Sequence, residues 1–497
     1  GVIGAGTTNT FLVPILGAQG TLSLFSILFL CLGFITILLV KRNLITPLIS
    51  GLCVVVLIVV IVRCPNITED LYISALMRNK QDESTYDTKL FHEGTVANIA
   101  VVDSPDGGRF LFLDGVGEVS TKFMHVQLFK ALSLLPILLH ESDEPKEALM
   151  IAFGAGLSAG AALDTGQLSS LEVVDLVSEA GMINPYFKAI NNDVYHHRQF
   201  HFVNDDGRNY LLGNPKKYSV IISDATHPFT YDSWILYTTD FYREVKNHLT
   251  SDGIFAQWIP LTIQKDFFRI LVNTFSEVFE HCTFWCIYGS DQAFIMATPK
   301  PFALDFQRFQ NRLDSIPESA KLKEYELDRA VNIASFFVMD EKSVGEFIKD
   351  EKRINTDDYP YNITFGLEKY LSSQIVRLDL DRDQASILPY LVNATENEKQ
   401  EIEELQVFAK TMLRFYAYQD INALMEARAI RPDNGITLYH TADREFLYPD
   451  IGPDTDTDQP AAEDTIDGLL AAIEEKPDTL SNYSKLAVLY ANNGNPD

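Results

Sequence analysis

Cysteine is scarce in this chain, which has only five in 497 residues. Cys31, Cys53 and Cys64 lie in or beside apolar runs, whereas Cys282 and Cys286 share a strand-like run. Such a set provides no disulfide framework, and one pair of cysteines supplies too few ligands for a metal site. We therefore expect reduced, buried cysteines and no bound metal.

Basic residues are also under-represented, with 40 Lys and Arg against 68 Asp and Glu and a formal net charge of −28. Nucleic-acid binding requires basic patches that neutralise phosphates, so this composition excludes nucleic acid as a partner. An acidic balance suits solubility and a cationic substrate, although charge alone is weak support for either. Many acids gather between Asp450 and Asp467, and we predict a solvated acidic linker over residues 448–464.

Charged side chains are almost absent from residues 21–40 and 45–62. Each run is long enough, or nearly so, to cross the ~30 Å hydrocarbon core of a bilayer. Residues 1–17 are apolar too, and no Met begins the chain, so we expect residues 1–63 to be transmembrane helices of which the first is truncated. A buried helix pair of a soluble protein is the alternative. A cleaved signal peptide does not fit, because two spans follow without a cleavage signature.

The basic residues near these runs leave the membrane orientation open. Lys41 and Arg42 favour a cytoplasmic loop, which places residue 64 onward outside. Arg63, Arg78 and Lys80 follow the second run and favour the opposite orientation. We therefore expect an integral membrane protein, with a cytoplasmic position of the following domain as the working expectation.

Four short apolar runs, over residues 148–153, 171–174, 200–203 and 218–223, dominate the next part of the chain. Helix-length segments separate them, which is typical of buried parallel strands in an α/β sheet. An acidic residue follows each of the last three runs, and a glycine-rich turn follows the first. Ligands of open α/β sheets bind at the carboxyl ends of the strands, so these features predict one site.

The glycine-rich turn contains Gly154 and Gly156. Glycine lets the backbone approach a ligand closely, and the following helix presents its N-terminus to that ligand. The turn lacks the full dinucleotide pattern, because Ser158 and Ala159 precede Gly160. We therefore expect a nucleoside rather than a pyrophosphate.

Each acid at a strand end has a ligand-binding interpretation and a local structural one. Asp175 can accept hydrogen bonds from two ribose hydroxyls, or it can cap the next helix. Asp205 and Asp206 stand where an adenine amine is commonly bound, and either can cap a helix instead. Asp224 can hold and deprotonate an attacking amine, or it can form an Asx-turn before Pro228.

The remaining patterns divide the chain into further units. Residues 64–122 are predicted to be a connector and a small antiparallel β unit, with a turn at Asp114-Gly115. Residues 123–370 form the α/β domain, with an antiparallel hairpin around residues 289–291. Residues 371–447 are predicted to be helical. Residues 465–497 resemble part of a tetratricopeptide repeat, although a plain amphipathic helix explains them nearly as well.

Several segments together match the pattern of one known family. Residues 86–262 resemble the spermidine synthases, and the whole chain is similar to their membrane-fused bacterial branch. This resemblance implies a class I methyltransferase-like α/β fold, Rossmann-like, and a place in the bacterial inner membrane. The matching segments are Phe112-Leu113-Asp114-Gly115, the glycine turn, Asp206-Gly207, Ile221-Ile222-Ser223-Asp224-Ala225-Thr226-His227-Pro228, Gly253-Ile254-Phe255-Ala256-Gln257-Trp258 and Asn355-Thr356-Asp357-Asp358-Tyr359-Pro360.

The resemblance also implies an activity and roles for residues. The family transfers an aminopropyl group from decarboxylated S-adenosylmethionine, a co-substrate rather than a tightly bound cofactor, to a polyamine such as putrescine. By resemblance Asp224 is the catalytic base. The donor would contact Gly154, Gly156, Asp175, Asp205, Asp206 and Gly207, and the amine substrate would contact His227, Gln127 and Gln257.

The chain departs from the family's pattern in the part that binds amines. Leu157 stands where the glycine motif usually carries an acid, and His227 replaces the second acid of the family's Asp-x-x-Asp pair. His125-Val126-Gln127 replaces a Tyr-Gln-Glu motif. Each lost acid removes a charge-assisted hydrogen bond usually worth ~1.5–3 kcal/mol. The nucleoside half of the site is therefore better supported than the amine half.

Three functions fit this sequence, in decreasing order of support. The first is a membrane-anchored aminopropyltransferase. The second is an S-adenosylmethionine-dependent methyltransferase-like enzyme on the same fold. The third is a non-catalytic membrane transport or scaffold protein with a nucleoside-sensing domain. Besides the amine substrate and the lipid membrane, a protein partner at the C-terminal repeat and a homo-oligomer are compatible with this organisation.

Overall fold

The computed structural model describes most of the chain up to residue 437. The described residues are 2–40, 45–64, 69, 72, 86–104, 107–224, 227–230, 233–287, 292–361, 384–418, 421–432, 434 and 437. The predicted linker at 448–464 and the predicted repeat at 465–497 lie outside the described residues.

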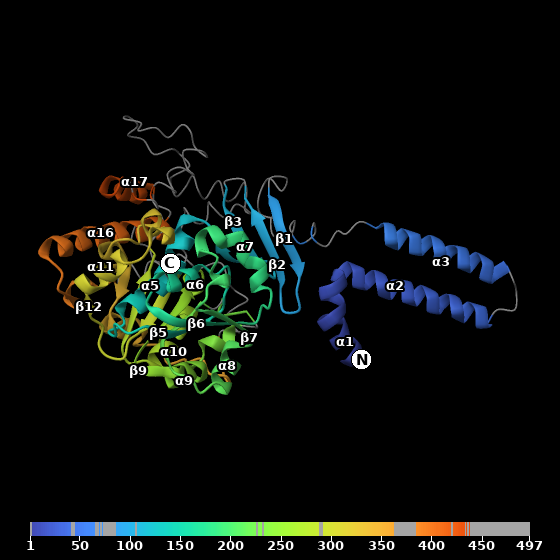
Figure 1. Ribbon diagram of the computed structural model, residues 1–497, viewed down its shortest axis with the longest axis horizontal. Coiled ribbons are helices and arrows are strands. Elements are labelled where there is room, and N and C mark those ends of the chain that lie inside the picture. Colours follow the sequence, from blue (N-terminus) through green and yellow to red (C-terminus); the bar gives the residue numbers. More distant parts are fainter. Residues whose placement is uncertain are drawn as a thin grey trace, which may run out of the picture.

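The N-terminal part is a helical hairpin beside the main body (Figure 1). Its long helices, α2 and α3, run side by side in opposite directions. One segment among the described residues, Thr10–Leu39, is long and apolar enough to cross a membrane, with a mean hydropathy of 2.7, and most of its side chains are at least partly exposed. The elements are α1 (Val2–Thr7), a π-helical turn (Thr8–Leu12), α2 (Val13–Val40) and α3 (Ile45–Arg63).

The second predicted span coincides with α3, but its apolar stretch, Leu48–Arg63, is shorter than that of α2. Cys31, Cys53 and Cys64 on this hairpin are exposed, so the expectation of buried cysteines is wrong for them. An apolar environment in the sequence does not bury a side chain when the helices have no protein neighbour on that face. The cysteines of the main body, Cys282 and Cys286, are buried and form no disulfide in the described part of the chain.

The hairpin contacts β1 of the main body where α2 is interrupted at Gly17. This residue has a φ of 73°, which glycine adopts without steric cost. The backbone N–H of Ala18 donates to Glu93 Oε2 on β1 at 3.0 Å. A Cβ at Gly17 would lie 2.7 Å from the same oxygen, so a larger residue would displace the Glu93 side chain as well as strain the turn.

A four-stranded antiparallel sheet follows, in the order β1-β2-β3-β4, as the sequence predicts. β3 and β4 are joined at Asp114 and Gly115, whose φ values of 47° and 83° are those of a tight hairpin turn. The strands are β1 (Asp87–Glu93), β2 (Asn98–Asp103), β3 (Arg109–Leu113) and β4 (Val116–Ser120).

The main sheet has eight strands in the order β13-β10-β11-β9-β8-β5-β6-β7. Its five strands from β9 to β7 are parallel, and β11, β10 and β13 add antiparallel strands at one side. This is the predicted class I methyltransferase-like sheet, including the hairpin of β10 and β11. The strands are β5 (Lys146–Ile151), β6 (Leu168–Asp175), β7 (Phe200–Asn204), β8 (Tyr218–Ser223), β9 (Leu249–Pro260), β10 (Cys282–Cys286), β11 (Gln292–Ala297) and β13 (Phe337–Met339).

Helices cover both faces of this sheet (Figure 1), with α5, α6 and α7 on one side and α8, α9 and α10 on the other. α5 is apolar all round and buried from Val126 to Leu138, which is typical of a core helix. α5 and α2 have similar compositions, yet only α5 is enclosed by protein. The helices are α5 (Phe123–Leu139), α6 (Leu157–Asp164), α7 (Ala180–Asn191), α8 (Gly207–Gly213), α9 (Thr239–His248) and α10 (Lys265–Val278).

The rest of the described chain packs beside the antiparallel strands of the main sheet. A short parallel pair, β12 and β14, joins its two parts. The elements are β12 (Leu304–Asp305), α11 (Phe306–Asp314), α12 (Ala330–Ala334), α13 (Glu341–Ile348), β14 (Leu391–Val392), α16 (Glu396–Tyr418) and α17 (Ile421–Ile430), with single 3₁₀ turns at Val194–His196, Trp234–Tyr237, Glu318–Ala320, Leu322–Tyr325 and Leu388–Tyr390.

Candidate active site

A pocket lies at the carboxyl ends of β5, β6 and β8, where the sequence predicts the site. The space between its walls, open solvent at the mouth included, is about 870 Å³. β4 of the small sheet covers one side of it. The lining residues are Leu113, Gly117, Glu118, Val119, Phe129, Ile151, Ala152, Gly154, Val174, Asp175, Leu176, Val177, Asp206, Gly207, Asp224, His227, Ser233, Leu236, Trp258 and Gln292.

The glycine turn between β5 and α6 shapes the floor of the pocket. Ala152, Gly154 and Gly156 all have positive φ values, of 73°, 54° and 74°. A Cβ at Gly156 would lie 2.7 Å from Cζ of Phe153, so the turn cannot close over a larger residue. Gly154 and Ala152 line the pocket, whereas Gly156 lies behind them as the N-cap of α6.

Asp175, at the end of β6, holds the turns on either side of it. Its Oδ2 accepts the Phe153 N–H at 2.6 Å, and its Oδ1 accepts the Val177 N–H at 2.7 Å. The N-cap of α7 is Glu179, so Asp175 does not cap that helix, and the capping alternative is wrong. A carboxylate oxygen can accept more than one hydrogen bond, so both oxygens retain capacity for ligand hydroxyls.

Of the two acids after β7, only Asp206 lines the pocket. Asp206 caps α8, with its Oδ1 accepting the N–H groups of Arg208 at 3.0 Å and Asn209 at 2.9 Å. Gly207 lines the pocket next to it. Asp205 Oδ1 accepts the Asp206 N–H at 2.8 Å, so its carboxylate supports the cap rather than the pocket wall.

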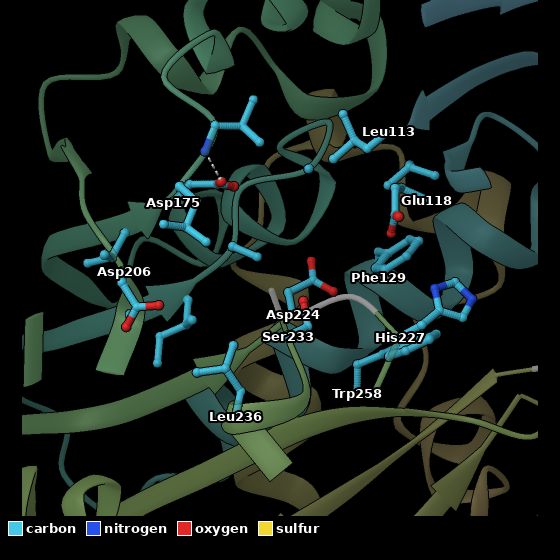
Figure 2. A pocket seen from close by; sticks show the side chains of 18 of the residues that line it. Leu113, Glu118, Phe129, Asp175, Asp206, Asp224, His227, Ser233, Leu236 and Trp258 are labelled. Atoms are coloured by element: carbon cyan, nitrogen blue, oxygen red, sulfur yellow. Dashed lines mark hydrogen bonds between the residues drawn. The ribbon is translucent and has the colours of Figure 1, made fainter. Parts of the chain in front are cut away.

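Asp224 occupies the centre of the pocket (Figure 2). It divides the pocket into one half that contains Asp175 and another that contains Glu118 and His227. Its Oδ2 accepts a hydrogen bond from Ser158 Oγ at 2.6 Å, and its Oδ1 is buried with no hydrogen-bond partner in the described structure. Burial is the main reason that its pKa is raised to about 7; the Ser158 hydrogen bond lowers the pKa and the charge of Asp175 raises it. A carboxyl with such a pKa is suited to accept a proton at neutral pH.

The other half of the pocket combines aromatic rings with one carboxylate. Figure 2 shows Glu118, Phe129, His227 and Trp258 beyond Asp224, on the side opposite Asp175. The His227 ring lies 5.4 Å from the Trp258 ring in an edge-on arrangement. This half therefore offers aromatic walls and one carboxylate, which fits an aliphatic cation.

The two predicted glutamines do not line the pocket. Gln127 is buried on α5, and its Nε2 donates to the Tyr325 carbonyl at 2.9 Å. Gln257 on β9 donates to the Leu236 carbonyl at 2.9 Å and accepts the Tyr242 hydroxyl at 2.6 Å. Both side chains therefore form hydrogen bonds within the protein interior beneath the site. The structure gives no support for their predicted role as substrate contacts. Leu157 is also buried in the core, so its apolar side chain does not set the charge of the pocket.

Sequence reasoning missed Ser158 and Glu118. Ser158 directly follows the glycine turn, but nothing in the local sequence shows that its hydroxyl reaches a residue 66 positions away. Glu118 lies on an antiparallel strand whose position over the main sheet is decided by tertiary packing. The Asp114-Gly115 turn predicts the hairpin and not its place above the pocket.

The carboxylates that line the pocket have no basic counterpart among the described lining residues. Acids line both halves, and none of the described lining residues is Lys or Arg. A ligand with positive charge is therefore favoured over one that carries a carboxylate or phosphate.

Part of this chain is similar to proteins of known family. Residues 134–297 match the sequence model of the spermine/spermidine synthase domain. Polyamine aminopropyltransferase 1 of Aquifex aeolicus is 29% identical over 171 residues, which are 34% of this chain and 60% of that protein, less than two thirds of its length. The polyamine aminopropyltransferase of Yersinia pestis is 27% identical over 258 residues, covering 49% of this chain and 84% of that protein.

Solved structures of similar proteins include a spermidine synthase in complex with the transition-state analogue AdoDATO. Its TM-score is 0.44 at 19% sequence identity, and the match covers 53% of this chain and 88% of that protein. The spermidine synthase of Thermotoga maritima gives a TM-score of 0.42 at 18% identity, over 53% of this chain and 87% of that one.

Proposed function

We propose that the spermine/spermidine synthase domain of this chain is an aminopropyltransferase that acts on decarboxylated S-adenosylmethionine and a polyamine acceptor such as putrescine. The observation that carries this proposal is Asp224, a buried carboxylate at a strand end whose Oδ1 points into an acidic pocket without a partner. The names of the relatives in Aquifex and Yersinia, both polyamine aminopropyltransferases, support the same reaction.

In the proposed reaction, Asp224 acts on the acceptor amine. An alkylammonium has a pKa near 10.4, so at neutral pH it is almost wholly protonated and cannot attack. Asp224 takes one proton as the nitrogen lone pair forms a bond to the aminopropyl carbon next to the sulfonium. The carbon–sulfur bond breaks and its electron pair stays on sulfur, which leaves neutral methylthioadenosine.

The nucleoside half of the pocket would orient the donor for this step. We propose that Asp175 binds the ribose hydroxyls and that Asp206, with Gly207 beside it, binds the adenine. Gly154 keeps the floor of the pocket free of side-chain atoms. Asp205 and Gly156 act from behind, because they support the cap of α8 and the glycine turn.

The charge of the lining favours this reaction over methyl transfer. S-adenosylmethionine carries a carboxylate that its decarboxylated form lacks, and the described lining offers no Lys or Arg to pair with it. Calorimetric titration with S-adenosylmethionine, its decarboxylated form and methylthioadenosine separates the two possibilities. We expect the decarboxylated donor to bind more tightly; tighter binding of S-adenosylmethionine would favour the methyltransferase.

The decisive test of the activity is Asp224→Asn. This change keeps the size of the side chain and removes the base, so we expect turnover on putrescine to fall by ~10²–10⁴ while methylthioadenosine affinity is largely retained. Product formation by mass spectrometry and binding by calorimetry provide the two readouts.

Asp358→Asn is the matched control, because it makes the same chemical change at an exposed acid that does not line the pocket. It should transfer at close to the wild-type rate. An Asp224→Asn variant that transfers at the native rate would show that the mechanism is wrong.

We further propose that the N-terminal hairpin holds this domain at a lipid membrane. The exposed apolar surface of α2 supports this proposal, since large apolar side chains along its membrane-length segment, such as Phe29 and Leu39, are exposed.

A further inference from the structure

We infer that Glu118 binds the distal ammonium of a diamine acceptor, the end that does not react. This inference rests on the proposed aminopropyl transfer and assigns the acceptor's second contact to the small β sheet rather than to the main one. In the related family a second acid stands at the position of His227. A contact with Glu118 would explain how this pocket can bind a dication without that acid.

The position of Glu118 is set by the tight hairpin of β3 and β4. In this strand pair Leu113 lies opposite Val116 and Phe112 lies opposite Gly117. This register brings the start of β4 to the edge of the pocket. Glu118 and Val119 both line the pocket. Figure 2 shows the Glu118 carboxylate beside Phe129, on the same side of the pocket as His227 and across Asp224 from Asp175.

The carboxylates in the pocket can be matched to the two amines of the acceptor. The donor's aminopropyl ammonium is a further cation, and if Glu118 paired with it, the loss of Glu118 would lower the rates with all acceptors alike. Asp175 and Asp206 belong to the nucleoside half, and Asp224 is required at the reacting amine. Glu118 is then the remaining carboxylate among the described lining residues. A diamine brings a second ammonium that must be paired when it leaves water, and His227 cannot pair with it, because an imidazole is neutral or positive.

The walls between Asp224 and Glu118 suit the methylene chain of such an acceptor. Phe129 and Trp258 line this part of the pocket, and Trp258 is 5% exposed. The faces of aromatic rings pack well against methylene groups and also attract a nearby cation. A diamine with one nitrogen at each carboxylate would therefore connect the main sheet to the small sheet.

The test compares two acceptors that differ only in the distal ammonium. Putrescine and n-butylamine have the same carbon chain, and only putrescine has the second nitrogen. With saturating decarboxylated S-adenosylmethionine, we expect Glu118→Gln to lower kcat/KM for putrescine by roughly 10–100-fold, as for the loss of a charge-assisted hydrogen bond. The value for n-butylamine should change by less than about threefold.

Two results would overturn the inference. An equal loss for both amines would mean that Glu118 serves the donor or the reacting nitrogen, and an unchanged putrescine value would mean that it holds no ammonium. Glu147→Gln is the matched control, since Glu147 lies on β5 outside the pocket and pairs with Lys216 at 3.3 Å. It should leave both acceptors unaffected.

A binding measurement keeps this inference separate from the proposed function. Wild-type protein that transfers aminopropyl to no amine would contradict the proposed function. Calorimetric titration of putrescine into protein loaded with methylthioadenosine then still tests Glu118, with affinity expected to fall roughly 10–100-fold in Glu118→Gln. Equal putrescine affinity in the two proteins would refute the role of Glu118 whatever the reaction.

Discussion

Ser158 shows how one hydroxyl adjusts the chemistry of this pocket. It donates the hydrogen bond that Asp224 receives from a side chain, at 2.6 Å from the first turn of α6. Burial and the charge of Asp175 raise the pKa of Asp224, and this hydrogen bond is the opposing influence. Ser158 therefore increases the ionised, proton-accepting fraction of Asp224 at neutral pH.

This balance predicts a pH profile. Asp224 must be ionised to take a proton, and its pKa is about 7, so kcat/KM should fall on the acid side of that value and level off above it. Ser158→Ala removes a bond that stabilises the carboxylate, so the pKa should rise and the acid limb should move to higher pH. Rates measured from about pH 5.5 to 9 test this, because kcat/KM reports the free enzyme.

The plateau above the limb should be retained in Ser158→Ala, which distinguishes a changed pKa from a damaged site. An acid limb that stays in place or moves to lower pH would contradict the role given to Ser158.

At the scale of elements, the segment Asn355-Thr356-Asp357-Asp358-Tyr359-Pro360 supports the pocket wall around Asp206 from outside. Asp357 forms an ion pair with Arg208, in the first turn of α8. Asp357 also accepts the Thr238 hydroxyl at 3.0 Å. These contacts fix the start of α8, and with it Asp206 and Gly207 in the pocket wall.

We predict that Asp357→Asn weakens methylthioadenosine binding by roughly 3–10-fold and leaves kcat nearly unchanged, because the ion pair positions α8 and does not touch the reacting atoms. Arg208→Gln should give a similar loss, and the double variant should be no worse than either single one. Calorimetry and steady-state kinetics measure the two quantities.

Asp358→Asn is the neighbouring control, since Asp358 is exposed. Additive losses in the double variant would show that Arg208 and Asp357 act independently, and the positioning role would then be wrong.

These elements also show which parts of the structure the sequence could reveal. Strand β8 was predicted with its observed bounds, because a short apolar run between polar segments is a local signal. Asp175 and Asp224 were placed at strand ends for the same reason. Glu118 and the misassigned Gln127 depend on how the small sheet and α5 pack on the main sheet, and that information lies in contacts distant in sequence.

At the scale of the whole molecule, two apolar helices of similar composition have different surroundings. α5 is enclosed by the main sheet and its neighbours, whereas Leu39 on α2 is 82% exposed. An exposed apolar surface of this length favours association with lipid over water.

We predict that the full chain stays in the membrane fraction after an alkaline carbonate wash, and that a chain beginning near Gln81 is soluble. The physical reason is that only the hairpin exposes a membrane-length apolar surface among the described residues. Fractionation followed by immunoblotting measures both. Release of the full chain by carbonate would contradict membrane insertion.

The contact between Ala18 and Glu93 has a consequence for where a bilayer would begin. A carboxylate is costly in hydrocarbon, so Glu93 marks a point that must stay at the polar surface. From Ala18 to Val40, α2 rises roughly 33 Å, which matches one hydrocarbon thickness. Since α3 runs back antiparallel to α2, the chain re-emerges on the side of Glu93. One surface label at Glu93 would therefore report the orientation of the whole protein, which the basic residues of the sequence leave undecided.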